Sequence, residues 1–74
     1  MNKAEMKKVI NSEFGFATNK IVLLEGYKNS FGKYDYIMFS AGCIEYQMNY
    51  DYIEERYVLY VYEHNGRIKD VRGL

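Results

Sequence analysis

The sequence predicts an α+β domain: one N-terminal helix packed on one face of a four- to five-stranded antiparallel sheet. Apolar residues recur at three- and four-residue steps near the N-terminus, and five short runs rich in β-branched and aromatic residues follow. Turn residues separate those runs. The 74 residues suffice for one small domain, 1–74. A helix followed by consecutive strands is typical of the α+β class.

The helix is expected over residues 3–14. Asn2 can cap its first turn, where Glu5 completes a weak capping box, and Gly15 is placed to end the helix in a left-handed conformation. One apolar stripe should face the sheet. It consists of Met6, Val9, Ile10 and Phe14.

Five strands are expected in the rest of the chain. They are residues 20–28, 33–42, 43–52, 56–64 and 67–72. The third alternates apolar and polar residues and should be half-buried. Residues 28–33 form a turn, and residues 50–56 form a long, acidic connection between the third and fourth strands.

Asn65-Gly66 between two strand-like runs predicts a two-residue type I′ hairpin, because both central residues of that turn need a positive φ. Such a turn fixes the register of the two strands. The expected pairs are Tyr60 with Val71, Val61 with Asp70, Tyr62 with Lys69, Glu63 with Ile68, and His64 with Arg67.

Both faces of the predicted sheet are apolar or aromatic, and a helix with one stripe can cover only one of them. The covered face should carry Ile37, Phe39, Ile44, Tyr46, Met48, Leu59 and Val61. The exposed face should carry Tyr34, Tyr36, Met38, Val58, Tyr60 and Tyr62, with Arg67 and Lys69 beside the last two. Because small soluble domains rarely leave a large apolar face exposed, we expect something to cover this tyrosine-rich face.

Composition argues against several functional classes. The formal net charge is zero, which disfavours a globally basic nucleic-acid binder. One cysteine, Cys43, allows no intrachain disulfide, and one histidine, His64, gives neither a convincing zinc site nor a catalytic pair. We therefore expect no enzyme activity, no metal and no cofactor. Without an apolar run of signal-peptide or membrane-spanning length, the expected location is the cytoplasm, with no membrane partner.

The exposed tyrosines favour recognition of another protein, because Tyr offers a large contact area at low entropic cost. Residues 34–66 hold six acids and one Arg, so a partner with a basic surface, such as the nucleic-acid-binding groove of a protein, is expected. The expected binding residues are Tyr34, Tyr36, Tyr60, Tyr62, Asp51, Glu54 and Glu55. The sequence then predicts a non-enzymatic inhibitor or modulator that occludes that surface.

Three alternatives remain open at this stage. A second copy of the chain could cover the exposed face as a homodimer, or residues 50–56 could fold back over it. Alternatively, the tyrosines could stack on the bases of single-stranded RNA or DNA, with Arg67 and Lys69 contacting phosphates.

The frequent Asn, Ile and Tyr, the excess of Lys over Arg and the absence of Pro suggest an AT-rich genome, such as that of a low-G+C bacterium or its phage. In size, composition and layout the chain resembles small accessory proteins of phages and mobile elements. Some of those proteins inhibit host defence or host enzymes. The resemblance implies a role in a bacterial host cell and assigns no residues.

Overall fold

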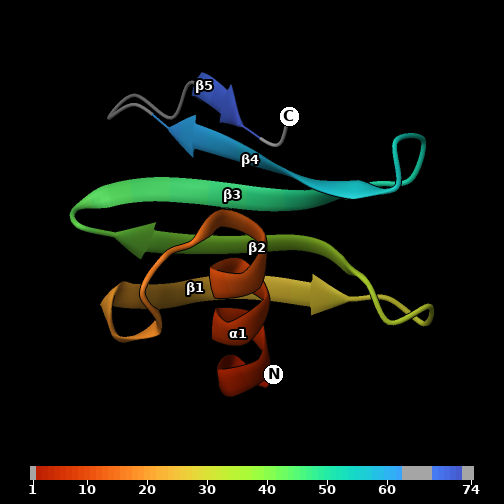
Figure 1. Cartoon of the computed structure of the whole chain (residues 1–74), viewed down its shortest axis with the longest axis horizontal. Coiled ribbons are helices and arrows are strands. Elements are labelled where there is room, and N and C mark those ends of the chain that lie inside the picture. The colour runs from red at the N-terminus through yellow and green to blue at the C-terminus, as the bar shows by residue number, and fades with distance from the viewer. Residues whose placement is uncertain (1, 63–67, 73–74) are drawn as a thin grey trace.

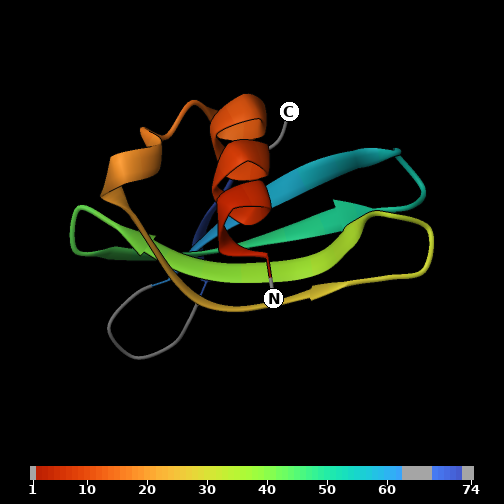
Figure 2. The ribbon, with the colours of Figure 1, turned by 90° about the horizontal axis from the view of Figure 1, so that it is seen from below.

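The computed structural model describes residues 2–62 and the backbone of residues 68–72. It confirms an α+β fold, in which one helix packs on an antiparallel sheet (Figure 1). The strands follow one another in the order β1-β2-β3-β4-β5, so each strand pairs with its neighbours in the sequence. Helix α1 lies on one side of the sheet, and no described helix or strand lies on the other side (Figure 2).

Helix α1 has the predicted bounds, Lys3–Phe14. The side-chain oxygen of Asn2 accepts a hydrogen bond from the Glu5 amide at 3.0 Å, which satisfies one of the free donors of the first turn. Gly15 ends the helix at φ 78°, as predicted, and its amide donates to Asn11. A short 3₁₀ turn, η1 (Thr18–Lys20), leads from the helix to the sheet.

The first four strands lie close to their predicted positions. Their bounds are β1 Ile21–Lys28, β2 Tyr34–Ala41, β3 Ile44–Asp51 and β4 Arg56–Tyr62. Strand β5, Ile68–Arg72, completes the sheet at its edge. The predicted Asn65-Gly66 turn, with Glu63 and His64, lies outside the described residues.

The predicted register between β4 and β5 is partly wrong. Tyr60 pairs with Val71 and Val61 with Asp70, as expected. Tyr62, however, pairs with Ile68 instead of Lys69, because the register shifts by one residue after Val61. An irregularity of this kind inserts one extra residue, here on β5, and breaks the simple alternation of pairs.

The core lies between α1 and the sheet. Met6 and Ile10 of the helix are buried, and Val9 and Phe14 pack against the same cluster. Six of the seven sheet residues predicted on the covered face are buried: Ile37, Phe39, Tyr46, Met48, Leu59 and Val61. Ile21 of β1 is buried with them. Ile44 was expected among them but is 45% exposed, so that prediction is wrong. It is the first residue of β3, beside the β2–β3 turn, where the sheet ends.

Gly26 lets the helix sit close to the sheet. A Cβ atom at this position would lie 2.7 Å from the terminal methyl of Met6, far inside normal contact distance. Gly26 pairs with Ile37, which is fully buried, so it occupies the covered face directly under the helix. The missing side chain therefore makes the space that Met6 fills.

The β2–β3 hairpin turns through Gly42 and Cys43, between the paired residues Ala41 and Ile44. Both have positive φ, 59° and 66°, which matches a type I′ turn. Glycine adopts this conformation freely, whereas Cys43 carries a Cβ that makes it unfavourable. Cys43 is exposed, so no packing compensates for the strain.

We expect Cys43→Gly to stabilise the domain by about 0.5–1 kcal/mol, because relief of the left-handed strain exceeds the added entropy of the unfolded chain. In a domain of this size, such a gain raises Tm by roughly 2–8 °C. Thermal unfolding followed by circular dichroism measures it. Cys43→Ser keeps the Cβ and serves as the control, with a Tm close to that of the parent. A lower Tm for Cys43→Gly would contradict the strain.

Candidate binding surfaces

The sheet face turned away from α1, called the open face, is the first candidate surface (Figure 2). Register and alternation place one set of side chains there: Val22, Glu25, Tyr27, Tyr36, Met38, Ser40, Glu45, Gln47, Asn49, Val58, Tyr60 and Tyr62. Tyr27 and Val22 of the edge strand β1 are more than half exposed, at 55% and 58%. The ring of Tyr36 on β2 and the rings of Tyr60 and Tyr62 on β4 are half-buried. The open face is thus a surface on which aromatic and aliphatic side chains outnumber polar ones.

A polar seam on β3 crosses the open face between the tyrosines of β2 and β4. The Tyr62 hydroxyl donates to the Gln47 side-chain oxygen at 2.8 Å, and the Gln47 amide donates to Asn49 at 2.9 Å. On the other side, the Tyr36 hydroxyl donates to Glu25 at 2.9 Å, and this hydrogen bond raises the pKa of Tyr36. These bonds hold Tyr36 and Tyr62 in fixed positions, which lowers the entropic cost of binding.

The structure brings three of the four predicted tyrosines, Tyr36, Tyr60 and Tyr62, onto the open face. Tyr34 is the exception, because it is only 2% exposed and belongs to the core. A register irregularity leaves Asp35 unpaired between Tyr34 and Tyr36. A bulge of this kind moves the preceding side chain to the other face of the strand, so Tyr34 joins Ile37 on the covered side.

Tyr34 instead helps to fix the helix to the end of the sheet. Its ring lies under the Lys28 ammonium at 5.7 Å, and that ammonium forms an ion pair with Glu5 at 2.6 Å. The bond from Lys28 holds the pKa of Glu5 below its usual value. Burial, followed by the hydrogen bond to Glu5, raises the pKa of Tyr34 to about 12. The Tyr34 backbone amide also donates a hydrogen bond to the Tyr57 hydroxyl, at 3.1 Å.

The three predicted acidic binding residues lie together at the β3–β4 hairpin. Asp51 ends β3 and accepts hydrogen bonds from the amides of Ile53 and Glu54, at 2.9 and 3.1 Å. Glu54 and Glu55 are exposed in the loop. Only residues 52–55 separate the paired Asp51 and Arg56. The expected long connection is therefore a short hairpin loop at the end of the sheet, and the alternative in which residues 50–56 cover the open face is wrong.

The residues of the nucleic-acid alternative lie beyond what the structure describes. Arg67 is outside the described residues, and so is the side chain of Lys69. Their proposed contacts with phosphates remain a prediction. The described open face carries the carboxylate of Glu25, which would repel a phosphate backbone.

A hydrogen-bonded cluster at the same end of the sheet was missed by the sequence analysis. The Tyr52 hydroxyl donates a hydrogen bond to the Asp35 carboxylate. The side-chain amide of Asn29 donates to the same carboxylate, at 3.0 Å, and to the Tyr52 hydroxyl oxygen. Hydrogen bonds from Tyr52 and then Asn29 hold the pKa of Asp35 below its usual value. The same bond to Asp35 raises the pKa of Tyr52 to about 12.

The cluster joins the β1–β2 loop to the β3–β4 loop. The side-chain oxygen of Asn29 accepts from the amides of Phe31 and Lys33, at 2.9 and 3.1 Å, so one residue also shapes its own loop. In a sheet whose strands follow chain order, the first and third hairpin loops lie at the same end. The predicted order of strands could therefore have indicated that Asn29, in the first loop, and Tyr52, in the third, lie at the same end of the sheet.

Within the described part of the chain, no helix has both the length and the apolar character needed to cross a membrane. Comparison with known proteins identifies no relative. No protein-family model matches the chain, and neither a curated protein nor a solved structure matches it.

Proposed function

We propose that this chain is a small protein-binding module that occludes a basic surface of another protein, acting without catalysis. The observation that supports this proposal is the open face, a tyrosine-rich surface that no described helix or strand covers (Figure 2). Its tyrosines are the residue type most favoured at the centres of protein interfaces. Monomeric soluble proteins rarely leave contiguous apolar surface of this kind unoccupied.

The preference for a basic partner rests on charge. Asp51, Glu54 and Glu55 lie within five residues at one hairpin, and Glu25 lies on the open face itself. Carboxylates at the rim of an interface attract a positively charged partner and speed its association, while the buried rings supply most of the affinity. A nucleic-acid-binding groove is the kind of surface that meets both requirements. On this proposal the chain modulates a host protein, as expected for an accessory protein of a phage or mobile element.

Capture from a bacterial lysate, with and without nuclease, tests the proposal. The tagged chain should recover a basic protein in both samples, and a nucleic-acid ligand of that protein should compete with the chain for it. The captured protein should be released as salt rises, because the rim charges are solvent-exposed. Recovery of nucleic acid alone would favour the single-stranded alternative. A chain that forms a stable dimer in light scattering and captures nothing would favour the homodimer.

A further inference from the structure

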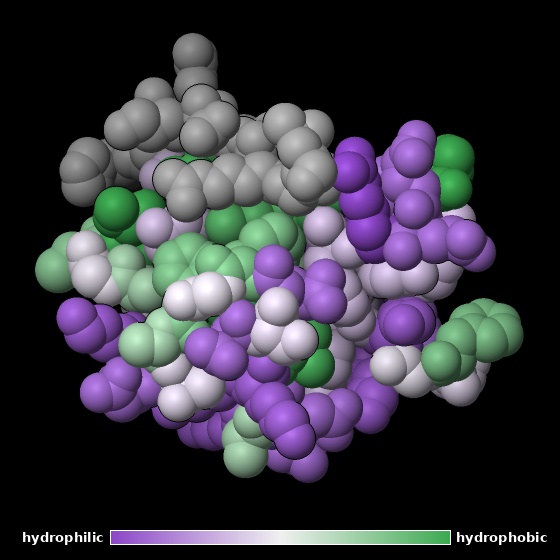
Figure 3. Space-filling model, viewed as in Figure 1, coloured by the Kyte–Doolittle hydropathy of each residue, from purple (hydrophilic) through white to green (hydrophobic). Residues whose placement is uncertain are grey.

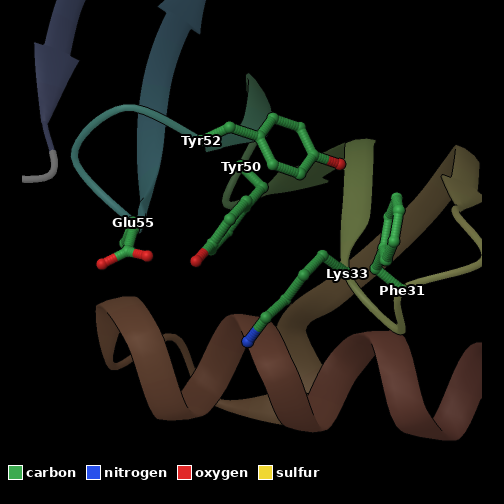
Figure 4. Close-up of a pocket in the computed structure, with 5 residues that line it drawn as sticks. All are labelled: Phe31, Lys33, Tyr50, Tyr52 and Glu55. Carbon is green, nitrogen blue, oxygen red and sulfur yellow. The ribbon is translucent and has the colours of Figure 1, made fainter.

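A pocket of about 320 Å³ opens at the end of the sheet between the β1–β2 and β3–β4 loops. Phe31, Lys33, Tyr50, Tyr52 and Glu55 line it (Figure 4). The Lys33 ammonium, the Tyr50 hydroxyl and the Glu55 carboxylate lie toward one side of the pocket, whereas the Tyr52 hydroxyl extends toward the side on which Phe31 stands (Figure 4). The pocket therefore combines three aromatic rings, one cation and one anion.

Two of the rings that line this pocket, Tyr50 and Tyr52, are held in place by contacts within the chain. Tyr52 is bonded to Asp35 and Asn29, which ties the two loops together. Tyr50 packs edge-on against Tyr52 and against the buried Tyr57, with ring centres 5.0 and 4.9 Å apart. A ligand consequently has little ordering cost to overcome at these two rings.

The pocket already attracts a positive charge. The Lys33 ammonium lies 5.2 Å from the centre of the Tyr50 ring, within the range of a cation–π contact. Among the described residues, no ion pair within salt-bridge distance involves Lys33 or Glu55. A cation is thus held on the ring face by a weak contact alone, beside a carboxylate that it does not neutralise.

The backbone holds Glu55 in an uncommon conformation. Its φ is 55°, in the left-handed region that non-glycine residues rarely adopt. Glycine or asparagine would fill this position at lower cost. Strained residues of this kind concentrate at ligand sites, where the surrounding structure enforces them. Glu55 is one of the five residues that line the pocket (Figure 4).

We propose that this pocket receives an arginine side chain of the basic partner, which displaces Lys33 from the Tyr50 ring and pairs with Glu55. A planar guanidinium can stack on an aromatic ring and bond a carboxylate with two parallel donors, which an ammonium cannot do. Asp51, Glu54 and Glu55, all at this hairpin, favour an incoming cation over an anion. This inference rests on the proposed function, because the arginine belongs to the partner of that proposal.

Two exposed apolar side chains flank the pocket and suit contact with the protein around that arginine. Phe31 is 85% exposed in the β1–β2 loop, and Ile53 is 92% exposed in the β3–β4 loop. Hydrophobic side chains protrude at the tips of both loops on the right of the space-filling view, with polar side chains between them (Figure 3). A protein segment that inserts arginine between the loops would cover both.

Titration of the purified chain with N-acetyl-arginine amide, followed by NMR, tests the site. The ring signals of Tyr50 and Tyr52 should shift, with saturation at millimolar concentrations. Lys33→Met removes the competing ammonium but keeps the stem, so it should tighten binding by about two- to fivefold, the equivalent of an exposed cation–π contact. Glu55→Gln removes the anion and should weaken binding by a similar or larger factor.

Lys20→Met is the matched control, because it removes the same charge from η1, near the end of the sheet opposite the two loops (Figure 1). It should leave arginine binding nearly unchanged. The corresponding capped citrulline, which has the same shape without the charge, should not shift the Tyr50 signals. Citrulline binding as tight as arginine, or an affinity unaltered by Lys33→Met, would overturn the inference. The titration contains no partner, so its failure leaves the protein-binding proposal standing, and failure of the lysate capture leaves the arginine site standing.

Discussion

Ile10→Asp is expected to abolish cooperative folding. Ile10 is 0% exposed and lies at the centre of the contact between α1 and the sheet. An aspartate there would bury a carboxylate without a partner, at a cost of several kcal/mol, while also losing about 1.5–3 kcal/mol of apolar burial. A chain of this length buries only about 60% of the surface exposed on unfolding, so its stability margin is small. Circular dichroism at 25 °C should show a largely unfolded chain.

Ser12→Asp is the control for this experiment. Ser12 is exposed on the same helix, so the substitution adds the same charge without burying it. We expect a loss of about 0.5 kcal/mol, because a negative charge near the C-terminus opposes the helix dipole. If Ile10→Asp melted cooperatively at the temperature of the Ser12 variant, the helix would not contribute to the core as described.

The second large effect is expected in the complex with the captured partner. Tyr60→Ala combined with Tyr62→Ala should weaken that complex by about 4 kcal/mol or more, near a thousandfold in Kd, because each truncated anchor costs about 2 kcal/mol. Isothermal titration calorimetry measures the change. The fold should survive, since both side chains lie on the open face, although loss of the Tyr62 bond to Gln47 removes about 1 kcal/mol of stability.

Two controls separate the anchors from general effects. Tyr62→Phe keeps the ring and removes only the hydroxyl, so it should cost the complex far less than Tyr62→Ala. Lys8→Ala with Ser12→Ala truncates two exposed residues on the helix, away from the open face, and should leave the affinity unchanged. A complex that kept its affinity after both tyrosine truncations would show that the open face is not the interface.

Both bounds of the helix were predictable to the residue because a capping residue stands at each end. Asn2 and Gly15 supply side-chain and backbone caps that local sequence alone determines. Strand positions were also predictable, since alternation and turn residues are local signals. The covered face followed from the same alternation wherever a strand is regular, as for Ile37, Phe39 and Leu59.

The errors arise where regularity breaks or where burial depends on distant elements. The bulge at Asp35 moved Tyr34 into the core, and the irregularity after Val61 gave Tyr62 a different partner. The alternation of side chains along a strand, with its period of two, does not reveal where a bulge inserts an extra residue. Ile44 is correctly placed along the strand, but it lies at the strand's first position, where the sheet ends. How far the helix reaches over the sheet is a tertiary property.

The arginine pocket shows the same limit for function. Phe31 and Lys33 come from the β1–β2 loop, whereas Tyr50 and Tyr52 come from the end of β3 and the loop that follows it. That these residues lie together depends on strand order and on the Asn29 cluster. Only Glu55 of this pocket was predicted as a binding residue, and it was chosen for its charge. Its positive φ could not be read from the sequence.

The order β1-β2-β3-β4-β5 has a consequence for how the chain reaches its native state. Each strand finds its partner across a short hairpin loop, so no pairing requires the closure of a long loop. Domains dominated by such local contacts have low contact order and fold quickly among proteins of similar stability. The hairpins can therefore form one after another along the chain. During folding, the edge of an unpaired strand is exposed only briefly before the next strand pairs with it. Rapid pairing of this kind shortens the time during which the tyrosine-rich strands are exposed to aggregation.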